Sequence, residues 1–251
     1  MKDGYGSFGA QASVYSFIRK GFPDEVFTVI KSLTPVLETL DLGCGTGISS
    51  RQLAEHGFIV TGSDYDERMI EEAKASSAKY QITYHAAPAN TLPFTDNSFD
   101  LITAFSAFHW FCDSSSIQEI KRVLKADGLF VAVNKNDSGG GMKEIIKKVI
   151  KTLLPADYKL PNAKVDYDPV NILTTAGFKR VGEQVIETVE EYTLAEAVNY
   201  TKTMSLFNLL SDDDKPKALA EIEKVLSAQY PDRVTQALKV SIVSGFNAKM
   251  G

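Results

Sequence analysis

The chain of 251 residues is poor in cysteine and has no long apolar run. Its two cysteines, Cys44 and Cys112, lack the spacing of metal ligands, so we expect reduced thiols, no metal site and no disulfide framework. No apolar stretch is long enough to cross a bilayer, and the first residues lack the apolar core of a secretory signal. These absences argue against a disulfide-rich secreted domain and against a membrane protein. They predict a soluble, cytoplasmic, globular protein.

Basic residues are too few to cover a surface. The 27 lysines and arginines are outnumbered by 32 aspartates and glutamates, which gives a net charge of −5. Because nucleic acids bind to basic faces, we expect neither a nucleic acid nor a membrane as partner, and a small molecule as substrate. With 44% hydrophobic residues, the chain is long enough for one large core, or for one domain with an appended lobe. Nothing in the sequence determines the oligomeric state.

What the sequence does contain is a cluster of glycines directly after an apolar segment. Gly43, Gly45 and Gly47 occupy alternate positions, and Asp64 closes the next apolar segment. Glycine permits a positive φ and has no Cβ to keep a ligand at a distance, and the helix that follows offers unpaired N–H groups at its start. The cluster therefore predicts a site for a cofactor that contains a nucleoside.

The spacing of the glycines separates the possible cofactors. A dinucleotide-binding loop needs G-x-G-x-x-G, but the third position of that pattern is Ile48 here. A P-loop ends in Gly-Lys-Ser/Thr, whereas this loop continues through Gly47, Ile48 and Ser49 without a lysine. A nicotinamide-dependent oxidoreductase is therefore a less favoured alternative. A non-catalytic protein that only binds a cofactor, or that serves an interaction, is the other alternative.

The segment from Asp41 to Gly47 resembles motif I of the class I S-adenosylmethionine-dependent methyltransferases, D/E-x-G-x-G-x-G, at every fixed position. In that family an acid at the end of the next strand holds both ribose hydroxyls, and Asp64 lies at this place. A carboxylate suits a vicinal diol because each of its oxygens accepts one hydrogen bond. The resemblance implies S-adenosyl-L-methionine as the cofactor.

Two later segments resemble the same family. Residues 89–100 are similar to the A-E-x-L-P-F-x-D-x-S-F-D stretch of many small-molecule methyltransferases, but Pro88 stands where relatives often have a polar side chain near adenine. Adenine contacts are then expected from the Ala89 backbone and from Asn90. Residues 105–111 resemble the A-x-H-W-F/V stretch of the trans-aconitate methyltransferase-like branch. The Asp-Pro-Pro-Tyr signature of amino-directed methyltransferases is absent, which disfavours a nucleobase amine as acceptor.

The N-terminal residues 8–23 resemble the entry segment of that branch, F-x-x-x-A-x-x-Y-x-x-x-R-x-x-Y-P. Tyr15 and Arg19 are four residues apart, so on a helix they share a face and cover the methionine end of the cofactor in this interpretation. The guanidinium of Arg19 matches a carboxylate in two hydrogen bonds. An arginine on a solvated helix surface is the alternative interpretation.

The resemblance thus implies two sets of site residues. The cofactor-binding residues are Tyr15, Arg19, Asp41, Gly43, Cys44, Gly45, Gly47, Asp64, Tyr65, Met69, Ala89, Asn90, Phe105 and Ser106. The substrate-binding residues are His109, Trp110, Met204 and Phe207. His109 is also the candidate catalytic base, with a structural histidine beside Trp110 as the equal alternative.

Apolar periodicity predicts alternating helices and strands in the first half of the chain and a helix-rich second half. Helices are expected over 23–33, 46–56, 66–78, 114–125, 142–154, 168–176, 192–210 and 213–229. Strands are expected over 36–42, 58–63, 82–85, 99–105, 129–133, 178–189 and 238–248. Five β–α units in series indicate an open, doubly wound α/β sheet.

In the resembled family two further strands complete the sheet, the seventh of them antiparallel, and inserted helices cap the substrate. The resemblance therefore implies a seven-stranded, mostly parallel, Rossmann-like sheet with a helical cap in the C-terminal half. We predict one methyltransferase domain over 1–251. Its parts are a cofactor-binding core at 8–135, the end of the core at 136–192, a helical substrate cap at 193–231 and a last strand at 232–251.

The predicted function is transfer of a methyl group from S-adenosyl-L-methionine to a small-molecule carboxylate or hydroxyl by in-line displacement. The sulfonium of this cofactor carries an activated methyl group, so alignment of a nucleophile and exclusion of water are the main tasks of the protein. A carboxylate acceptor needs no general base. A hydroxyl or a carbon acid makes His109 the leading base candidate.

Overall fold

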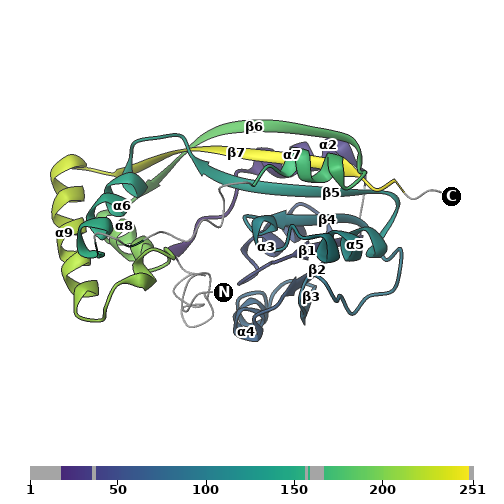
Figure 1. Ribbon diagram of the computed structural model, residues 1–251, viewed down its shortest axis with the longest axis horizontal. Helices are drawn as coiled ribbons and strands as arrows, with labels where there is room; N and C mark the ends of the chain where they lie inside the picture. Colours follow the sequence, from purple (N-terminus) through teal and green to yellow (C-terminus); the bar gives the residue numbers. More distant parts are fainter. Residues whose placement is uncertain (1–17, 36–37, 156–157, 159–166, 249–251) are drawn as a thin grey trace. The chain divides into compact units, whose positions relative to one another are not determined.

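A computed structural model describes residues 18–35, 38–155, 158 and 167–248. In these residues a seven-stranded sheet has the order β3-β2-β1-β4-β5-β7-β6, which Figure 1 shows from the bottom to the top of the sheet. The first five strands pair in parallel, β1 with β2 and β4, β2 with β3, and β4 with β5. The predicted α/β, doubly wound, mostly parallel sheet is confirmed.

The elements follow one another in the alternation that the sequence predicts. The strands are β1 (Glu38–Leu42), β2 (Ile59–Asp64), β3 (Ile82–Ala86), β4 (Phe99–Phe105), β5 (Leu124–Asp137), β6 (Lys179–Tyr192) and β7 (Val234–Phe246). The α-helices are α2 (Asp24–Leu33), α3 (Ile48–Glu55), α4 (Glu67–Ser76), α5 (Ser114–Val123), α6 (Met142–Leu153), α7 (Pro169–Thr175), α8 (Leu194–Thr201) and α9 (Asp214–Gln229). Short 3₁₀ turns are η2 (Phe108–Trp110) and η3 (Phe207–Leu209).

The two faces of the central strands are both apolar, because helices cover each of them. On β4, Leu101 and Phe105 belong to a core cluster with α2 and α3, whereas Ile102 and Ala104 belong to a cluster with α5 and α7. Successive side chains of a strand point to opposite faces, so this alternation places one cluster on each side of the sheet. A strand covered on both faces explains why five of the seven residues of β4 are apolar.

The last strand reverses the direction of the sheet. Main-chain hydrogen bonds join Gly128 to Asn247 and Ser138 to Ala237, so residue numbers rise along β5 while they fall along β7. The predicted antiparallel seventh strand is confirmed, although it extends over Val234–Phe246 rather than 238–248. The strand expected over 129–133 is longer in the structure. Asp127 has a left-handed φ of 58°, yet its main-chain bond to Asn247 keeps it inside β5.

The chain divides into two compact units. The sheet unit contains residues 20–135, 163–186 and 240–251, and the helical unit contains residues 1–19, 136–162 and 187–239. In the helical unit, the helices α6, α8 and α9 share one apolar cluster that includes Ile146, Tyr200 and Ile222. The predicted cap at 193–231 therefore packs against one more helix than expected, because α6 joins its apolar cluster together with Tyr192 of β6 and Val234 of β7. The single-domain organisation itself stays a prediction.

The helix predicted over 192–210 differs from the structure at both ends. Tyr192 was expected to begin a long helix, but it is the last residue of β6, and α8 ends at Thr201. The physical reason is a capping box, in which Thr193 accepts the N–H of Glu196 while the Glu196 carboxylate accepts the N–H of Thr193. This arrangement starts the helix after Thr193 and leaves Tyr192 extended.

Helix α5 begins at a charged cap whose effect depends on pH. Asp113 accepts hydrogen bonds from the Ser115 hydroxyl and from the Ser116 N–H, and these bonds lower the pKa of its carboxyl from 3.8 to about 2. We expect Asp113→Ala to lower the free energy of unfolding by about 1 kcal/mol at pH 7, since the cap is exposed to solvent. A lowered pKa stabilises the folded state above the ordinary pKa and loses this effect as the pH falls through the lowered one. Urea unfolding of both proteins should show the difference shrinking between about pH 4 and pH 2. An unchanged difference over this range contradicts the assignment.

Candidate functional site

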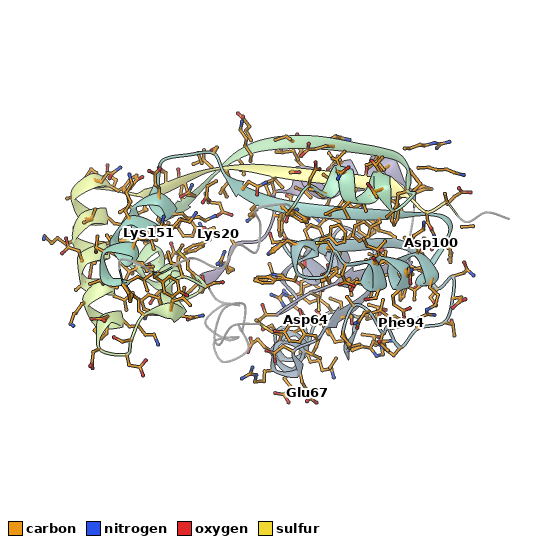
Figure 2. All side chains as sticks on the ribbon, viewed as in Figure 1. Lys20, Asp64, Glu67, Phe94, Asp100 and Lys151 are labelled. Carbon is orange, nitrogen blue, oxygen red and sulfur yellow. The ribbon has the colours of Figure 1, made fainter. Side chains whose placement is uncertain are left out.

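The predicted cofactor-binding residues of the sheet unit lie at one edge of the sheet, where the parallel strands end. The register places Leu42 of β1 opposite Ser63 of β2, and Asp64 of β2 opposite Ala86 of β3. Ligands of open α/β sheets bind outside the carboxyl ends of the strands. Figure 2 labels Asp64 at this edge, next to the start of α4 at Glu67. The geometry therefore brings the sequence motifs of β1, β2 and β3 to one place.

The glycine loop has the left-handed backbone that the sequence predicts. Gly43, Gly45 and Gly47 have φ values of 72°, 54° and 74°. A Cβ at Gly47 would lie 2.4 Å from the Tyr84 hydroxyl oxygen, so protein packing requires a glycine there. A Cβ at Gly45 would meet no atom within 4 Å. Gly45 is thus the point of the loop where a ligand can approach the backbone closely.

Asp41, at the start of the glycine loop, is hydrogen-bonded to the helix that follows the loop. Its side chain is fully buried, and its carboxylate accepts hydrogen bonds from three hydroxyl groups, those of Ser49 and Ser50 at 2.7 Å each and that of Thr103 at 3.1 Å. Burial raises the pKa of Asp41, and the three hydroxyl donors oppose that shift. The structure gives this predicted cofactor-binding residue internal partners, so we assign it a supporting role under the loop. Cys44 is also buried, and burial raises the pKa of its thiol well above the usual value.

Asp64 joins the loop to the end of β2. One carboxylate oxygen accepts the N–H of Gly45 at 2.9 Å, and the other accepts the N–H of Asp66 at 3.0 Å. Burial raises the pKa of Asp64, whereas these two backbone donors counteract the shift. A carboxylate has about four acceptor positions in all, so its backbone partners leave room for a further donor. A carboxylate at the end of a strand matches a pair of vicinal hydroxyl groups, because both of its oxygens are acceptors.

The segment after β3 forms the next wall of this edge. The N–H of Ala87 donates to the carbonyl oxygen of Asp64 at 2.8 Å, and the N–H of Thr91 donates to that of Pro88 at 3.1 Å. The turn between these bonds carries Ala89, which is half-buried, and Asn90, which is exposed. After β2 itself, Tyr65 is 57% exposed, whereas Met69 in α4 is buried. The exposed Tyr65 ring is therefore available for contact with a ligand, whereas Met69 belongs to the core.

The end of β4 supplies the last part of the edge. Phe105 is buried, and Ser106 is an exposed residue with φ 52°, a left-handed conformation that is uncommon outside glycine. In the turn η2 that follows, Trp110 is 39% exposed, and the His109 ring lies 4.8 Å from the Trp110 ring. Tyr167 also contacts His109 edge-on, with ring centroids 5.7 Å apart. This aromatic contact fixes the direction of the histidine ring.

Tyr167 is itself held by a buried amide. Asn134 of β5 donates to the Tyr167 hydroxyl at 3.1 Å. Burial raises the pKa of Tyr167 to about 12, so its phenol is neutral at physiological pH. The tyrosine that packs against His109 is therefore uncharged.

Residues 40–132 match the sequence model of a family described as a methyltransferase domain. This match includes the glycine loop and Asp64, and relatives along most of the chain are named as methyltransferases. The chain is therefore an enzyme, a methyltransferase, and S-adenosyl-L-methionine, the methyl donor implied by the resemblance of its glycine loop, is its cofactor. The comparisons do not single out the trans-aconitate methyltransferase-like branch, which stays a prediction.

Relatives of the methyltransferase extend over nearly its whole length. An uncharacterized methyltransferase of Schizosaccharomyces pombe is 23% identical over 244 residues, which cover 91% of this chain and 92% of the relative. A structure from Anaeromyxobacter dehalogenans, assigned as a type II methyltransferase, has a TM-score of 0.69 at 22% identity and covers 92% of this chain and 99% of its own. Phosphoethanolamine N-methyltransferase 2 of Haemonchus contortus, solved with phosphomonomethylethanolamine and S-adenosylhomocysteine, has a TM-score of 0.55 at 19% identity and covers 96% of this chain and 58% of its own. At these identities the structures establish the fold.

Three predicted site residues of the methyltransferase, Arg19, Met204 and Phe207, belong to the helical unit. Tyr15 is outside the described residues. Arg19, expected to hold the carboxylate of the cofactor, instead donates to the Thr203 hydroxyl at 2.9 Å, to the Thr203 carbonyl at 3.1 Å and to the Tyr200 hydroxyl at 2.7 Å. Met204 and Phe207, expected to line a substrate pocket, are less than a tenth exposed in the apolar cluster of the helical unit. Helix packing accounts for both side chains.

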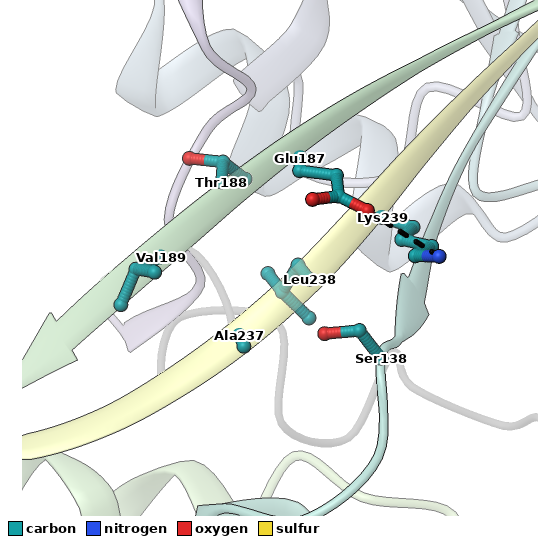
Figure 3. A pocket seen from close by; sticks show the side chains of 7 residues that line it. All are labelled: Ser138, Glu187, Thr188, Val189, Ala237, Leu238 and Lys239. Carbon is teal, nitrogen blue, oxygen red and sulfur yellow. Dashed lines mark ion pairs between the residues drawn. The ribbon is translucent and has the colours of Figure 1, made fainter.

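A groove of about 410 Å³ lies in the helical unit, and none of the predicted site residues lines it. It runs over the strands β6 and β7, where Glu187 and Lys239 form an ion pair at 3.3 Å (Figure 3). Its lining residues are Ser138, Glu187, Thr188, Val189, Ala237, Leu238 and Lys239. Within the described parts of the chain, no group of three histidine, cysteine, aspartate or glutamate residues is arranged as metal ligands, and no helix has the length and apolar character needed to cross a membrane.

One supporting residue of the methyltransferase site was missed in the sequence. The ring of Tyr84 lies between β2 and the glycine loop, because a Cβ at Gly62 would come within 2.5 Å of it and a Cβ at Gly47 within 2.4 Å of its hydroxyl. The Tyr84 hydroxyl is also hydrogen-bonded to Ser77 at 2.9 Å. The available signal was Gly62, since an isolated glycine inside a strand marks the close approach of another group.

Proposed function

We propose that this methyltransferase transfers the methyl group of S-adenosyl-L-methionine to a carboxylate or hydroxyl of a small molecule. The observation that carries the proposal is the backbone of Gly45, which is left-handed, open on its ligand side and hydrogen-bonded to Asp64. This arrangement combines an approachable backbone with a carboxylate at the end of the neighbouring strand. The small acceptor bound by the Haemonchus contortus enzyme supports a small-molecule substrate.

The residues at the edge fit the parts of this cofactor. Asp64 accepts the two ribose hydroxyls, and Gly45 lets the nucleoside lie against the loop. The turn with Ala89 and Asn90 faces the adenine ring, and the exposed ring of Tyr65 lies next to the ribose-binding carboxylate. Gly43, Cys44 and Gly47 shape the loop, while Phe105 and Ser106 form its neighbour at the end of β4. These contacts define the cofactor half of the proposed site.

The acceptor chemistry follows from the donor. The cofactor supplies a methyl group on a positively charged sulfur, and the leaving group is neutral. The acceptor oxygen forms the new C–O bond as the C–S bond breaks, so the protein must place that oxygen in line and exclude water. Well-oriented reactants reach effective molarities of about 10⁵–10⁸ M, which makes placement the main contribution of the protein. A hydroxyl acceptor also loses a proton, and His109 beside Trp110 is the proposed base.

A methyl-transfer screen tests this function. Purified protein is incubated with S-adenosyl-L-methionine and with small carboxylic acids, phenols and quinone precursors, and release of S-adenosylhomocysteine is followed. We expect turnover with members of one of these classes. Turnover only with amines or nucleic acids contradicts the proposed acceptor. Calorimetry with NAD(H) addresses the oxidoreductase alternative, for which heat of binding at the site would be required.

Substitution of His109 by glutamine separates the two acceptor classes. With a hydroxyl acceptor we expect kcat to fall about 100-fold, since general-base catalysis contributes at least this much. With a carboxylate acceptor we expect kcat to change by less than about threefold, because no proton is removed. His85→Gln is the matched control, since His85 contacts Phe94 edge-on at the end of β3 and has no proposed role. Equal losses in both variants contradict a specific role for His109.

A further inference from the structure

The turn of Ala89 and Asn90, proposed to face adenine, is called the adenine-side turn. An arginine and a glutamate of helix α5 form hydrogen bonds with the segment that follows this turn. Arg122 donates to the carbonyl oxygens of Phe94 at 2.8 Å and Leu92 at 3.2 Å, and to the carboxylate of Asp96 at 2.8 Å. Figure 2 labels Phe94, which lies within this segment of residues 92–98, and Asp100, which follows it. One guanidinium thus fixes the main chain at two positions of residues 92–98, which we call the clamped segment.

Glu119 completes the attachment. Its carboxylate accepts two hydrogen bonds from Arg122, at 2.7 Å and 2.9 Å, and a third from the N–H of Leu92 at 2.9 Å. The hydrogen bonds from Arg122 lower the pKa of Glu119, so the carboxylate is charged at neutral pH. The pair is bidentate and less than a third exposed, with exposed fractions of 31% and 17% for the two side chains. Such a charge-assisted pair is stronger and more directional than a single surface ion pair.

The end of the clamped segment is also joined to α5 through the main chain. The N–H of Asn97 donates to the carbonyl oxygen of Arg122 at 3.0 Å, and that of Ser98 donates to Val123 at 2.8 Å. At the start of the segment, both the amide and the carbonyl of Leu92 have partners on α5, Glu119 and Arg122. The position of the whole segment follows from the position of the helix.

The adenine-side turn lies between this attachment and a second one. At its beginning, the Ala87 N–H is bonded to the carbonyl oxygen of Asp64, the residue proposed to hold the ribose. At its end, Leu92 is bonded to Glu119 and Arg122. Between these points the described residues show a single internal main-chain bond, from Thr91 to Pro88. The distance between the turn and the ribose-binding carboxylate is therefore determined by the two attachments.

We propose that Arg122 and Glu119 are positioning residues that set the adenine specificity of the methyltransferase by fixing the turn of Ala89 and Asn90 at its Leu92 end. The inference rests on the proposed cofactor site. Neither side chain touches the cofactor in this proposal. Both act through the main chain of Leu92, and the ribose contact of Asp64 is independent of them.

The test compares three ligands, S-adenosylhomocysteine, its inosine analogue and its 2′-deoxy analogue, by calorimetry with the full chain. The inosine analogue lacks the adenine amino group, and the 2′-deoxy analogue lacks a ribose hydroxyl. We expect the unaltered protein to prefer S-adenosylhomocysteine over each analogue by at least about tenfold, as expected when a buried polar partner is left unpaired. Arg122→Met should reduce the preference over the inosine analogue to less than about threefold and leave the preference over the 2′-deoxy analogue unchanged.

Matched variants separate positioning from general destabilisation. Lys125→Met removes an ion pair with Asp100 that has no contact with the clamped segment, and it should keep both preferences. Glu119→Gln is the milder variant, for use if Arg122→Met does not fold, and should lose part of the preference over the inosine analogue. Parallel loss of affinity for all three ligands in Arg122→Met or Glu119→Gln overturns the inference, and so does an unaltered protein that binds the inosine analogue equally well. An unaltered protein that binds none of the three overturns the proposed cofactor site instead.

Discussion

Asparagine in place of Asp64 is expected to weaken binding of S-adenosylhomocysteine about 1,000-fold, or by about 4 kcal/mol, because two charge-assisted hydrogen bonds to ribose are lost or reversed. In the folded protein the carboxylate accepts the N–H groups of Gly45 and Asp66. An amide group has an NH₂ donor on one side, which faces one of these N–H donors and leaves it without an acceptor. The substitution therefore disturbs the loop as well as the ribose contact. Calorimetry with the purified protein measures the effect.

The neighbouring carboxylate provides the control for Asp64. Asp66 caps α4 by accepting the N–H of Arg68 at 3.0 Å, and asparagine is an equally good capping residue. Asp66→Asn should therefore change the affinity for S-adenosylhomocysteine by less than about threefold and leave the fold stable. If Asp64→Asn binds as tightly as Asp66→Asn does, the ribose assignment is wrong. The proposed adenine positioning by Arg122 is then wrong as well, because it rests on the same cofactor site.

Alanine at Gly45 is expected to reduce the affinity for S-adenosylhomocysteine about 200-fold, which corresponds to about 3 kcal/mol. The new Cβ projects into the space where no protein atom lies within 4 Å, and this is the space proposed for the nucleoside. Since nothing in the protein is displaced, the loss should appear in binding much more than in folding. Calorimetry and urea unfolding of the same preparation measure the two quantities.

Gly57→Ala is the control that measures how much a left-handed alanine lowers the free energy of unfolding. Gly57 also has a positive φ, 84°, and a Cβ there would meet no atom within 4 Å. A left-handed alanine costs about 1 kcal/mol at either position, so Gly45→Ala and Gly57→Ala should lower the free energy of unfolding by similar amounts. Only Gly45→Ala should weaken binding of S-adenosylhomocysteine. Equal affinities in the two variants refute the proposed approach of the ligand to Gly45.

Local chemistry explains why much of the fold was predictable. The helix α4 begins after Asp66 as expected, because a short acidic side chain before a helix accepts a free N–H of its first turn. The loop after β1 has the left-handed backbone that its three glycines permit. The buried strands were recognised because side chains on both faces of a covered sheet must be apolar. In each case the residues that carry the signal also make the contact.

The partners of two predicted site residues depend on contacts between distant residues. Asp41 was assigned to the cofactor, yet its carboxylate is used by Ser49, Ser50 and Thr103. Arg19 was assigned to the cofactor as well, but its donors are taken up by residues more than 180 positions away. A spacing pattern cannot reveal such partners, because hydrogen bonds depend on which side chains the fold brings within about 3 Å.

Considered alone, the sequence determined the order of helices and strands, the left-handed glycine loop and the acid at the tip of the second strand, since these depend on backbone sterics and on short-range hydrogen bonds. Tertiary structure alone decided that Tyr84 supports the loop, that α6 packs with the helices α8 and α9, and that Arg122 and Glu119 hold the end of the adenine-side turn. These outcomes depend on which surfaces meet when the sheet is assembled. The energy of such long-range packing and hydrogen bonding is a property of the folded chain as a whole.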